Sequence, residues 1–334
     1  MDTVIYAAMH FGVDFICAWA MFGSLRDGNI DLLVYNFCAF ALQMPLGTLL
    51  DLLRSGGRER LSRLWAIAGA ALTVVGALIH PALLGLGNAL FHVGGGMDII
   101  SADFEKNRKG KDLGVFVAPG AVGLYLGTGM GKGDGSAAAL FVGAAVLAVL
   151  TALLVRGKQD HFYEAAESGP GNLFLGLCCF AVVILRSFVG LSVSFSWKTG
   201  AFFGWLAVAA VAMGKMAGGF LSACIGPDRA IRYSLLLAAG CFALGEHPVC
   251  GLLALFFFNM SMPVTLYLLA RQLPRMPGFS FGFLTFGLFL GFLPVYAGLE
   301  LPVSGGLLGA AGCLLSLLLL AAGRKAVRGS RVPS

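Results

Sequence analysis

The chain has 334 residues, of which 58% are hydrophobic and only 12% are charged, and its formal net charge is +6. Its mean hydropathy is +0.86. So few charged residues cannot cover the surface of a water-soluble protein of this length, which excludes a soluble globular enzyme or a soluble binding domain. We therefore expect an all-α polytopic membrane protein whose main partner is the lipid bilayer.

Apolar stretches recur along the whole chain, and each ends at a short charged or Gly/Pro-rich stretch. A helix needs about 20 apolar residues to cross a bilayer. The first stretch lacks a preceding basic segment and a small-residue cleavage site, so we expect no cleavable signal peptide. The ninth stretch is short, which leaves eleven spans as an alternative to twelve. The twelve predicted spans are roughly 4–24, 29–53, 64–80, 82–100, 114–131, 136–155, 171–195, 201–223, 231–246, 249–270, 278–297 and 302–322.

Lys and Arg residues gather in alternate connections between these spans. If the N-terminus is cytoplasmic, the outside loops hold only Arg26, Lys132 and Lys198, and most other basic residues lie inside. This bias follows the positive-inside rule, so we expect both termini in the cytoplasm and an even number of spans in the inner (plasma) membrane. The basic net charge is then a topology signal, and no nucleic-acid partner is expected.

Other common sites are missing from the sequence. The eight cysteines are scattered and form no C-x-x-C pair, so we interpret them as small packing residues and expect no metal site. The stretch "GTGMGKGDGS" at 127–136 resembles a phosphate-binding loop, but Gly133 follows Lys132 where such a loop needs Ser or Thr. We therefore expect neither an enzyme nor a bound cofactor.

The chain resembles itself across its middle. The stretches "PLGTLLDLLRSGGRERLSRLW" and "GKMAGGFLSACIGPDRAIRYSL" align when Gly47 is placed on Gly219, an offset close to half of the chain length, and the polar stretch 156–170 lies between them. Two six-helix halves with a substrate site between them are one known transporter architecture. The alternative is that Gly-rich helix ends with basic loops occur in any polytopic protein. We expect bundles at 1–155 and 171–334, joined by a cytoplasmic linker at 156–170.

The first of these stretches resembles the loop signature of the major facilitator superfamily, Gly-x-Leu-x-Asp followed by Gly-Arg. Its residues are Gly47, Leu49, Asp51, Gly57 and Arg58. The resemblance implies the major facilitator fold, two six-helix bundles related by a pseudo-twofold axis, and a monomer that carries a small molecule.

The signature also predicts a conformational gate. We expect Asp51, at a helix end, to form charge-assisted bonds with Arg54 and Arg58 that hold one conformation closed. The second copy contributes Gly218 and Gly219 to this gate, but it has Ala223 and Cys224 where an acid and a base are common.

Four fragments resemble the fosmidomycin-resistance branch of that superfamily: "HFGVDF", "GLGNALFHVGGG", "LRSFVGLSVSF" and "MSMPVTLYLLARQLPRMPGFSFGF". This resemblance implies export of small molecules, with the proton gradient as the energy source. Pro119 stands in the fifth span where the branch usually has Gly, and the chain is shorter than typical members, so the substrate is left open.

Charged groups at bilayer depth cost several kcal/mol, so they usually face a cavity or a partner. His10 and Asp14 are spaced i, i+4 and share one helix face. The repeat offset maps Asp14 onto Arg186, and we expect the two to face each other across a central cavity. Asp14 would release a proton beside Arg186 and bind one when the halves move apart. The alternative is a static pair that locks two helices.

His92, in the fourth span, is a second candidate for carrying protons, together with His10, because imidazole titrates near neutral pH. The alternative is a histidine that bonds to a neighbouring helix. Polar residues predicted to line the cavity are Arg186, Ser187, Asn88, Asn259, Thr265 and Lys215. The neutral ones can equally act as bonds between helices, and Lys215 can reach the membrane surface. Asp98, Asp103 and Glu105 are expected in a solvated loop.

Three functions are compatible with this sequence. The first is export of a small organic solute in exchange for protons. The second is uptake of a solute together with protons on the same fold, since the same buried groups serve both directions. The third is a non-transporting membrane receptor or assembly component, which the altered second gate allows.

Overall fold

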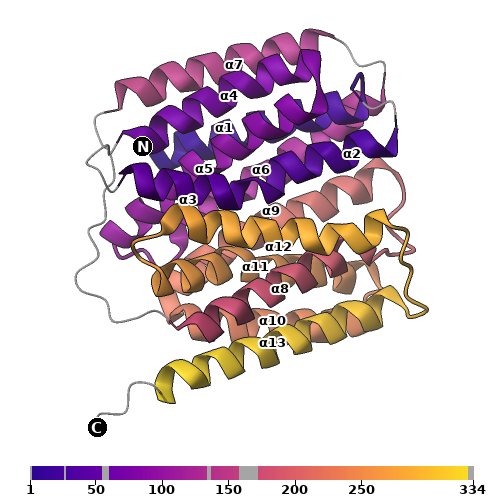
Figure 1. Cartoon of the computed structure of the whole chain (residues 1–334). Helices are drawn as coiled ribbons and strands as arrows, with labels where there is room; N and C mark the ends of the chain where they lie inside the picture. Colours follow the sequence, from indigo (N-terminus) through magenta and orange to yellow (C-terminus); the bar gives the residue numbers. More distant parts are fainter. Residues whose placement is uncertain (1, 26–27, 55–59, 134–136, 158–171, 330–334) are drawn as a thin grey trace. The chain divides into compact units, whose positions relative to one another are not determined.

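The computed structural model describes residues 2–25, 28–54, 60–133, 137–157 and 172–329, and every regular element in these ranges is a helix (Figure 1). The helices are α1 (Asp2–Phe22), α2 (Asn29–Asn36), the π-helical turn η1 (Phe37–Ala41), α3 (Gln43–Arg54), α4 (Leu61–Ile79), α5 (Pro81–Glu105), α6 (Lys111–Lys132), α7 (Ala137–Arg156), α8 (Leu173–Ser192), α9 (Gly200–Ile225), α10 (Pro227–Ala243), α11 (Pro248–Gln272), α12 (Pro277–Tyr296) and α13 (Gly305–Gly329).

Within the described ranges, eleven spans are long and apolar enough to cross a membrane, and α2, η1 and α3 together form one of them. The remaining helix, α10, has 17 residues and corresponds to the ninth predicted span, the short one. With α10 the described chain has twelve helical passes. The predicted all-α membrane fold is therefore confirmed.

The chain divides into two compact units. Unit 1 comprises Met1–Asn107, Val115–Tyr163 and Met276–Gly282, and unit 2 comprises Arg108–Gly114, Glu164–Arg275 and Phe283–Ser334. The segments 108–114 and 276–282 each cluster with the other half of the chain. They have equal lengths, and the sequence offset between them is similar to that between Gly47 and Gly219. The domain limits at 155 and 171 stay a prediction, since residues 158–171 lie outside the described part of the chain.

Helix starts follow local chemistry. Pro81, Pro227 and Pro248 each begin a helix, where the missing N–H of proline leaves no bond unmade. Asn172 precedes α8, and its Oδ1 accepts a hydrogen bond from the backbone N–H of Leu175 at 3.0 Å. These residues fix where the helices begin, and therefore which face of each helix its polar side chains occupy.

In unit 1, α4 and α5 pack closely along their whole length. Glycines make this possible. A Cβ atom added at Gly69 would clash with the backbone of Phe91, and one added at Gly94 would clash with the backbone of Ala66. Small residues let helix backbones approach in a membrane, where apolar side chains gain little by leaving lipid. Helix α1 packs against α4, α5 and α7 and is mostly buried.

The expectation of a solvated loop is wrong for Asp98 and Asp103, whereas Glu105 is exposed at the end of α5. Helix α5 continues to Glu105, and both Asp98 and Asp103 are buried. Asp98 accepts hydrogen bonds from the hydroxyl of Tyr6 at 2.6 Å and from Ser62. Two donors on α1 and α4 thus stabilise a carboxylate inside the helix bundle, and neither donor is near Asp98 in the sequence.

The glycine packing of unit 1 gives a stability prediction. Gly69→Ala should destabilise the protein by about 1 to 3 kcal/mol, because its methyl group meets backbone atoms that move only with the whole helix. The measurement is the thermal unfolding midpoint of the purified protein in detergent.

The matched control is Gly129→Ala in α6, where an added Cβ meets no atom within 4 Å. Alanine is the better helix former by about 1 kcal/mol, so this control should leave the midpoint unchanged or raise it. Equal midpoints for the two variants would contradict the packing argument.

Candidate functional site

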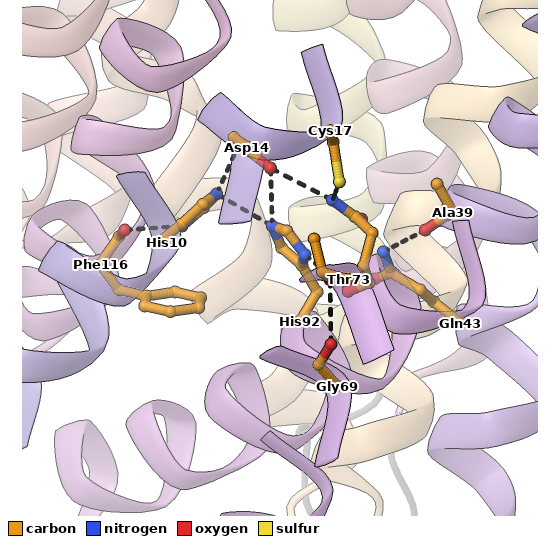
Figure 2. Close-up of polar contacts among 10 residues, drawn as sticks. His10, Asp14, Cys17, Ala39, Gln43, Gly69, Thr73, His92 and Phe116 are labelled. Carbon is orange, nitrogen blue, oxygen red and sulfur yellow. Dashed lines mark hydrogen bonds and ion pairs between the residues drawn. The ribbon is translucent and has the colours of Figure 1, made fainter. Parts of the chain in front are cut away.

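The candidate site begins on α1, where His10 and Asp14 lie one helical turn apart. Nε2 of His10 lies 3.1 Å from Oδ2 of Asp14. Both side chains point toward α5, as Figure 2 shows. The side chain of His10 is buried and that of Asp14 is 22% exposed. The i, i+4 spacing that the sequence offers therefore does produce a local acid–imidazole pair.

Helix α5 adds His92 to this pair. Its Nε2 lies 2.9 Å from Nε2 of His10 and 3.7 Å from Oδ1 of Asp14. Three titratable groups from two distant parts of the sequence thus meet around one point in unit 1 (Figure 2). We call these three side chains the His–Asp–His cluster.

Backbone carbonyls hold both imidazoles in one orientation. Nδ1 of His10 lies 2.8 Å from the carbonyl oxygen of Phe116, and Nδ1 of His92 lies 2.9 Å from that of Asn88. A carbonyl oxygen only accepts, so each Nδ1 carries the hydrogen. In the neutral imidazole the Nε2 atom then has a lone pair, and both Nε2 atoms point into the cluster.

Aromatic rings and one glycine surround the cluster. The ring of His10 lies against Phe91 and Phe116, and that of His92 lies against Phe91 and Phe281. Gly120 of α6 faces the two polar atoms of α1, since an added Cβ would clash with Nε2 of His10 and Oδ2 of Asp14. The sequence prediction missed Gly120, although it stands directly after the unusual Pro119.

Asn88 extends the cluster by one step along α5. Its Nδ2 donates to Oδ1 of Asp14 at 3.2 Å and lies 3.5 Å from Sγ of Cys17. Its Oδ1 is buried and has no hydrogen-bond partner among the described residues. Asn88, one of the predicted cavity residues, therefore touches a proton-coupling candidate.

Arg186 belongs to unit 2 and is also buried. Its guanidinium donates to the carbonyl oxygen of Phe258 at 3.0 Å, to Ser261 at 2.9 Å and to Oδ1 of Asn259 at 2.7 Å. It also lies over the ring of Phe258, 5.2 Å from its centre. Three neutral acceptors on α11 therefore hold this charge. The expected pairing with Asp14 stays a prediction, because the two residues belong to different units.

The other predicted cavity residues bond to the backbone of unit 2. Ser187 donates to the carbonyl of Leu288 at 2.7 Å, and Thr265 donates to that of Ser261 at 2.7 Å. Asn259 receives the Arg186 bond and donates to Leu255 at 2.8 Å. Lys215 is partly buried on α9. The serine and threonine bonds fit the alternative interpretation, in which neutral polar residues hold helices in shape.

Asp51 of the predicted gate is bonded to the start of another helix. The carboxylate of Asp51 accepts hydrogen bonds from the backbone N–H groups of Gly278 at 2.9 Å and Phe279 at 2.7 Å, at the start of α12 within unit 1. A carboxylate at a helix N-terminus is stabilised by the unpaired N–H groups and the helix dipole. Arg54 is buried and donates to Ser101 at 3.3 Å, and Arg58 lies outside the described residues.

The gate glycines all lie at close helix contacts. Gly47 packs against the backbone of Gly278 in unit 1, and Gly219 packs against the backbone of Gly110 in unit 2. Gly218 packs against the backbone of Met260. In unit 2 the contact at α6 is closed by Ser222, whose hydroxyl donates to the carbonyl of Lys109 at 2.5 Å. The second copy thus keeps the glycine packing, and the residue beside the missing acid, Ser222, bonds to a backbone carbonyl there.

The Asp51 contact predicts a graded loss of stability. Asp51→Asn keeps an acceptor for one N–H group and loses the charge, and Asp51→Ala loses both. Thermal midpoints in detergent should fall in the order wild type, Asn, Ala, with about 1 kcal/mol or more lost in the alanine variant. An alanine variant as stable as the wild type would contradict this role.

The Arg186 contacts predict that a conservative substitution is not tolerated. Arg186→Lys keeps the charge, but a single ammonium group cannot reach three acceptors in this arrangement. Leaving a buried acceptor unpaired costs about 1 to 3 kcal/mol, so the thermal midpoint should fall. The control is Arg271→Lys, since Arg271 is exposed near the end of the same α11. An equal fall in both variants would contradict the assignment.

Comparisons with known proteins agree with the architecture. No protein-family model matches the chain, and no curated protein matches its sequence. Solved structures do match. The fucose:proton symporter FucP of E. coli is 14% identical with a TM-score of 0.62, and FucP in the outward conformation, described as a major facilitator superfamily transporter, is 13% identical with a TM-score of 0.62. A bacterial homologue of the iron transporter ferroportin in its outward-facing state is 14% identical with a TM-score of 0.61.

Each of these matches covers 97% of this chain and 99% of the solved one. At such low identity the likeness shows the fold alone. It gives no support to the fosmidomycin-resistance branch. The chain has the fold of the major facilitator superfamily transporters.

Proposed function

We propose that the chain is a secondary active transporter that exports a small organic solute in exchange for protons by alternating access. The observation that carries this proposal is the His–Asp–His cluster. Two Nε2 lone pairs and a carboxylate, all electron-rich, lie within 3.7 Å of one another. Such groups repel unless a cation lies among them, and a proton is the smallest cation that fits.

The cluster suits proton exchange because of its surroundings. Buried histidine and acid groups in membrane helices commonly mark proton pathways. Asp14 is the most exposed of the three, which favours it as the point where protons enter and leave. His10 and His92 then share the proton along their 2.9 Å contact. Coupling follows if solute binding and protonation favour different conformations of the two halves.

Uptake of a solute together with protons is the second candidate. It is supported by the likeness to a fucose:proton symporter, although 14% identity reaches only the fold. The export direction is supported by the four sequence fragments that resemble an exporting branch. The geometry of the two units does not favour export over uptake. A non-transporting receptor is the third candidate, and the well-packed gate glycines in both units argue against it.

The membrane location belongs to the same proposal. We infer a multi-pass protein of the inner (plasma) membrane with both termini in the cytoplasm, on the strength of the positive-inside distribution. Arg186 contributes as a buried cation that attracts an anionic group of the solute. The cargo would then be a small molecule that the chain binds as a monomer.

The test is proton flux in liposomes. The purified protein is reconstituted with an internal pH dye, an outward solute gradient is imposed, and phosphonates, sugars and amphiphilic drugs are screened. For an exporter, at least one solute should acidify the lumen as it leaves. Asp14→Asn should abolish this flux, because the amide binds no proton at the same position.

The matched control is Glu300→Gln, the same chemical change at an exposed residue after α12, which should keep the wild-type flux. An inward gradient run in parallel separates the candidates, since a symporter carries protons in the same direction as the solute. If no solute in the panel moves protons in either direction, and pH does not alter radiolabelled solute movement, the proposed function is wrong.

A further inference from the structure

The three groups of the His–Asp–His cluster form a small triangle of possible metal ligands. The two Nε2 atoms are 2.9 Å apart, and each faces one carboxylate oxygen of Asp14, at 3.1 Å for His10 and 3.7 Å for His92. Donor atoms held at about 2.1 Å by a tetrahedral metal ion lie about 3.4 Å apart. With one donor atom from each residue, the three atoms lie within 4.8 Å of one another. Small movements of the side chains would therefore let the three groups share one metal ion.

The donor set has the chemistry of a transition-metal site. Two imidazole nitrogens and one carboxylate oxygen suit divalent first-row metals such as Zn²⁺, Fe²⁺ or Mn²⁺, and they do not suit Mg²⁺ or Ca²⁺, which prefer oxygen ligands throughout. His10, Asp14 and His92 form the one such group of three or more residues in the part of the chain that the structure describes.

The hydrogen bonds behind the cluster point the same way. A metal-binding histidine almost always donates its other N–H to a carbonyl or carboxylate, which fixes the tautomer and aims the lone pair. Both histidines do so, to Phe116 and Asn88. A histidine that serves only to pack against its neighbours does not need an Nδ1–carbonyl hydrogen bond, and here both histidines have one.

Asn88 lies next to the cluster and offers a further ligand atom. Gly120 packs the backbone of α6 against the cluster, and a Cβ there would lie within 2.5 Å of Nε2 of His10 and of Oδ2 of Asp14. Nδ2 of Asn88 lies 3.2 Å from Asp14, while its Oδ1 is buried without a partner among the described residues. The oxygen and nitrogen atoms of a side-chain amide are assigned from their hydrogen bonds. With these two atoms exchanged, Oδ1 of Asn88 would face the cluster as a fourth metal ligand.

We propose that the His–Asp–His cluster binds a divalent first-row transition-metal ion, which is a second class of cargo for this chain. Two imidazoles and one carboxylate are one strong ligand fewer than structural zinc sites usually have, which favours an exchangeable ion. Metal binding needs deprotonated ligands, so the ion displaces the protons of the cluster and is exchanged for them. Carriage of the ion rests on the proposed function, but its binding does not.

The first experiment measures binding to the full chain, purified in detergent and stripped of metal with a chelator. Co²⁺ is titrated in, and its visible absorption reports ligand geometry. We expect one saturable Co²⁺ per chain, displaced by Zn²⁺. Asp14→Asn and His92→Gln should each weaken Co²⁺ binding by about tenfold or more. His247→Gln is the matched control, because His247 is exposed and its side chain makes no helix-capping bond.

Wild-type protein that shows no saturable Co²⁺ binding would overturn the inference, as would variants that bind as tightly as wild type. If a variant does not elute as a folded protein, X-ray absorption of the Zn²⁺-loaded wild type decides. Two imidazoles among the Zn²⁺ ligands support the site, and one or none overturns it.

Transport assays keep the two proposals apart. An organic solute that drives proton flux in a protein that binds no metal would leave the proposed function standing and overturn the metal site. Metal binding at the cluster without proton flux for any organic solute or for Zn²⁺ would keep the site and remove the transport role.

Discussion

Close packing of helix backbones is the constraint on which the candidate site depends. In a bilayer, helices are held together by direct contact and by hydrogen bonds between them, since lipid is as apolar as the side chains. Gly69 and Gly94 bring α5 against α4, and Gly123 brings α6 against the backbone of Phe11 in α1. Because these backbones approach so closely, His92 reaches His10, and the carbonyl of Phe116 reaches the other side of the same imidazole. Larger residues at the glycines would separate the three groups.

The two units have residues of opposite charge, Asp14 and Arg186, at positions that the repeat offset aligns. Unit 1 gathers a carboxylate and two imidazoles, at Asp14, His10 and His92. Unit 2 holds a permanent cation, Arg186, at the position that the repeat offset assigns to Asp14, and surrounds it with neutral acceptors. In the proposed transporter, unit 1 would bind a cation and unit 2 would attract an anionic group of the solute. The gate differs as well: the carboxylate of Asp51 accepts two backbone hydrogen bonds in unit 1, while the repeat offset places Ala223 at the corresponding position of unit 2.

Hydropathy was sufficient to predict the helices, because a lipid environment leaves the backbone few alternatives to a helix. Helical spacing was sufficient to pair His10 with Asp14. The sequence offered His92 as a separate proton carrier, since no local pattern reveals which face of α5 meets α1. Gly120 was missed because a glycine in a glycine-rich helix carries no signal of its own. Asp98 was misplaced because Lys106 and Arg108 lie close in sequence, whereas its partners Tyr6 and Ser62 lie on other helices.

In the proposed transporter, exchange of a metal ion for protons needs a simpler coupling mechanism than exchange of an organic solute for protons. An organic solute and a proton bind at different atoms, so the coupling between them has to pass through the relative movement of the two halves. A divalent ion and the protons need the same lone pairs of His10, His92 and Asp14, so each excludes the other directly. Competition of this kind is built into the cluster by its 2.9 to 3.7 Å spacing. Under the proposed function, alternating access would then need only to expose this one site to each side of the membrane in turn.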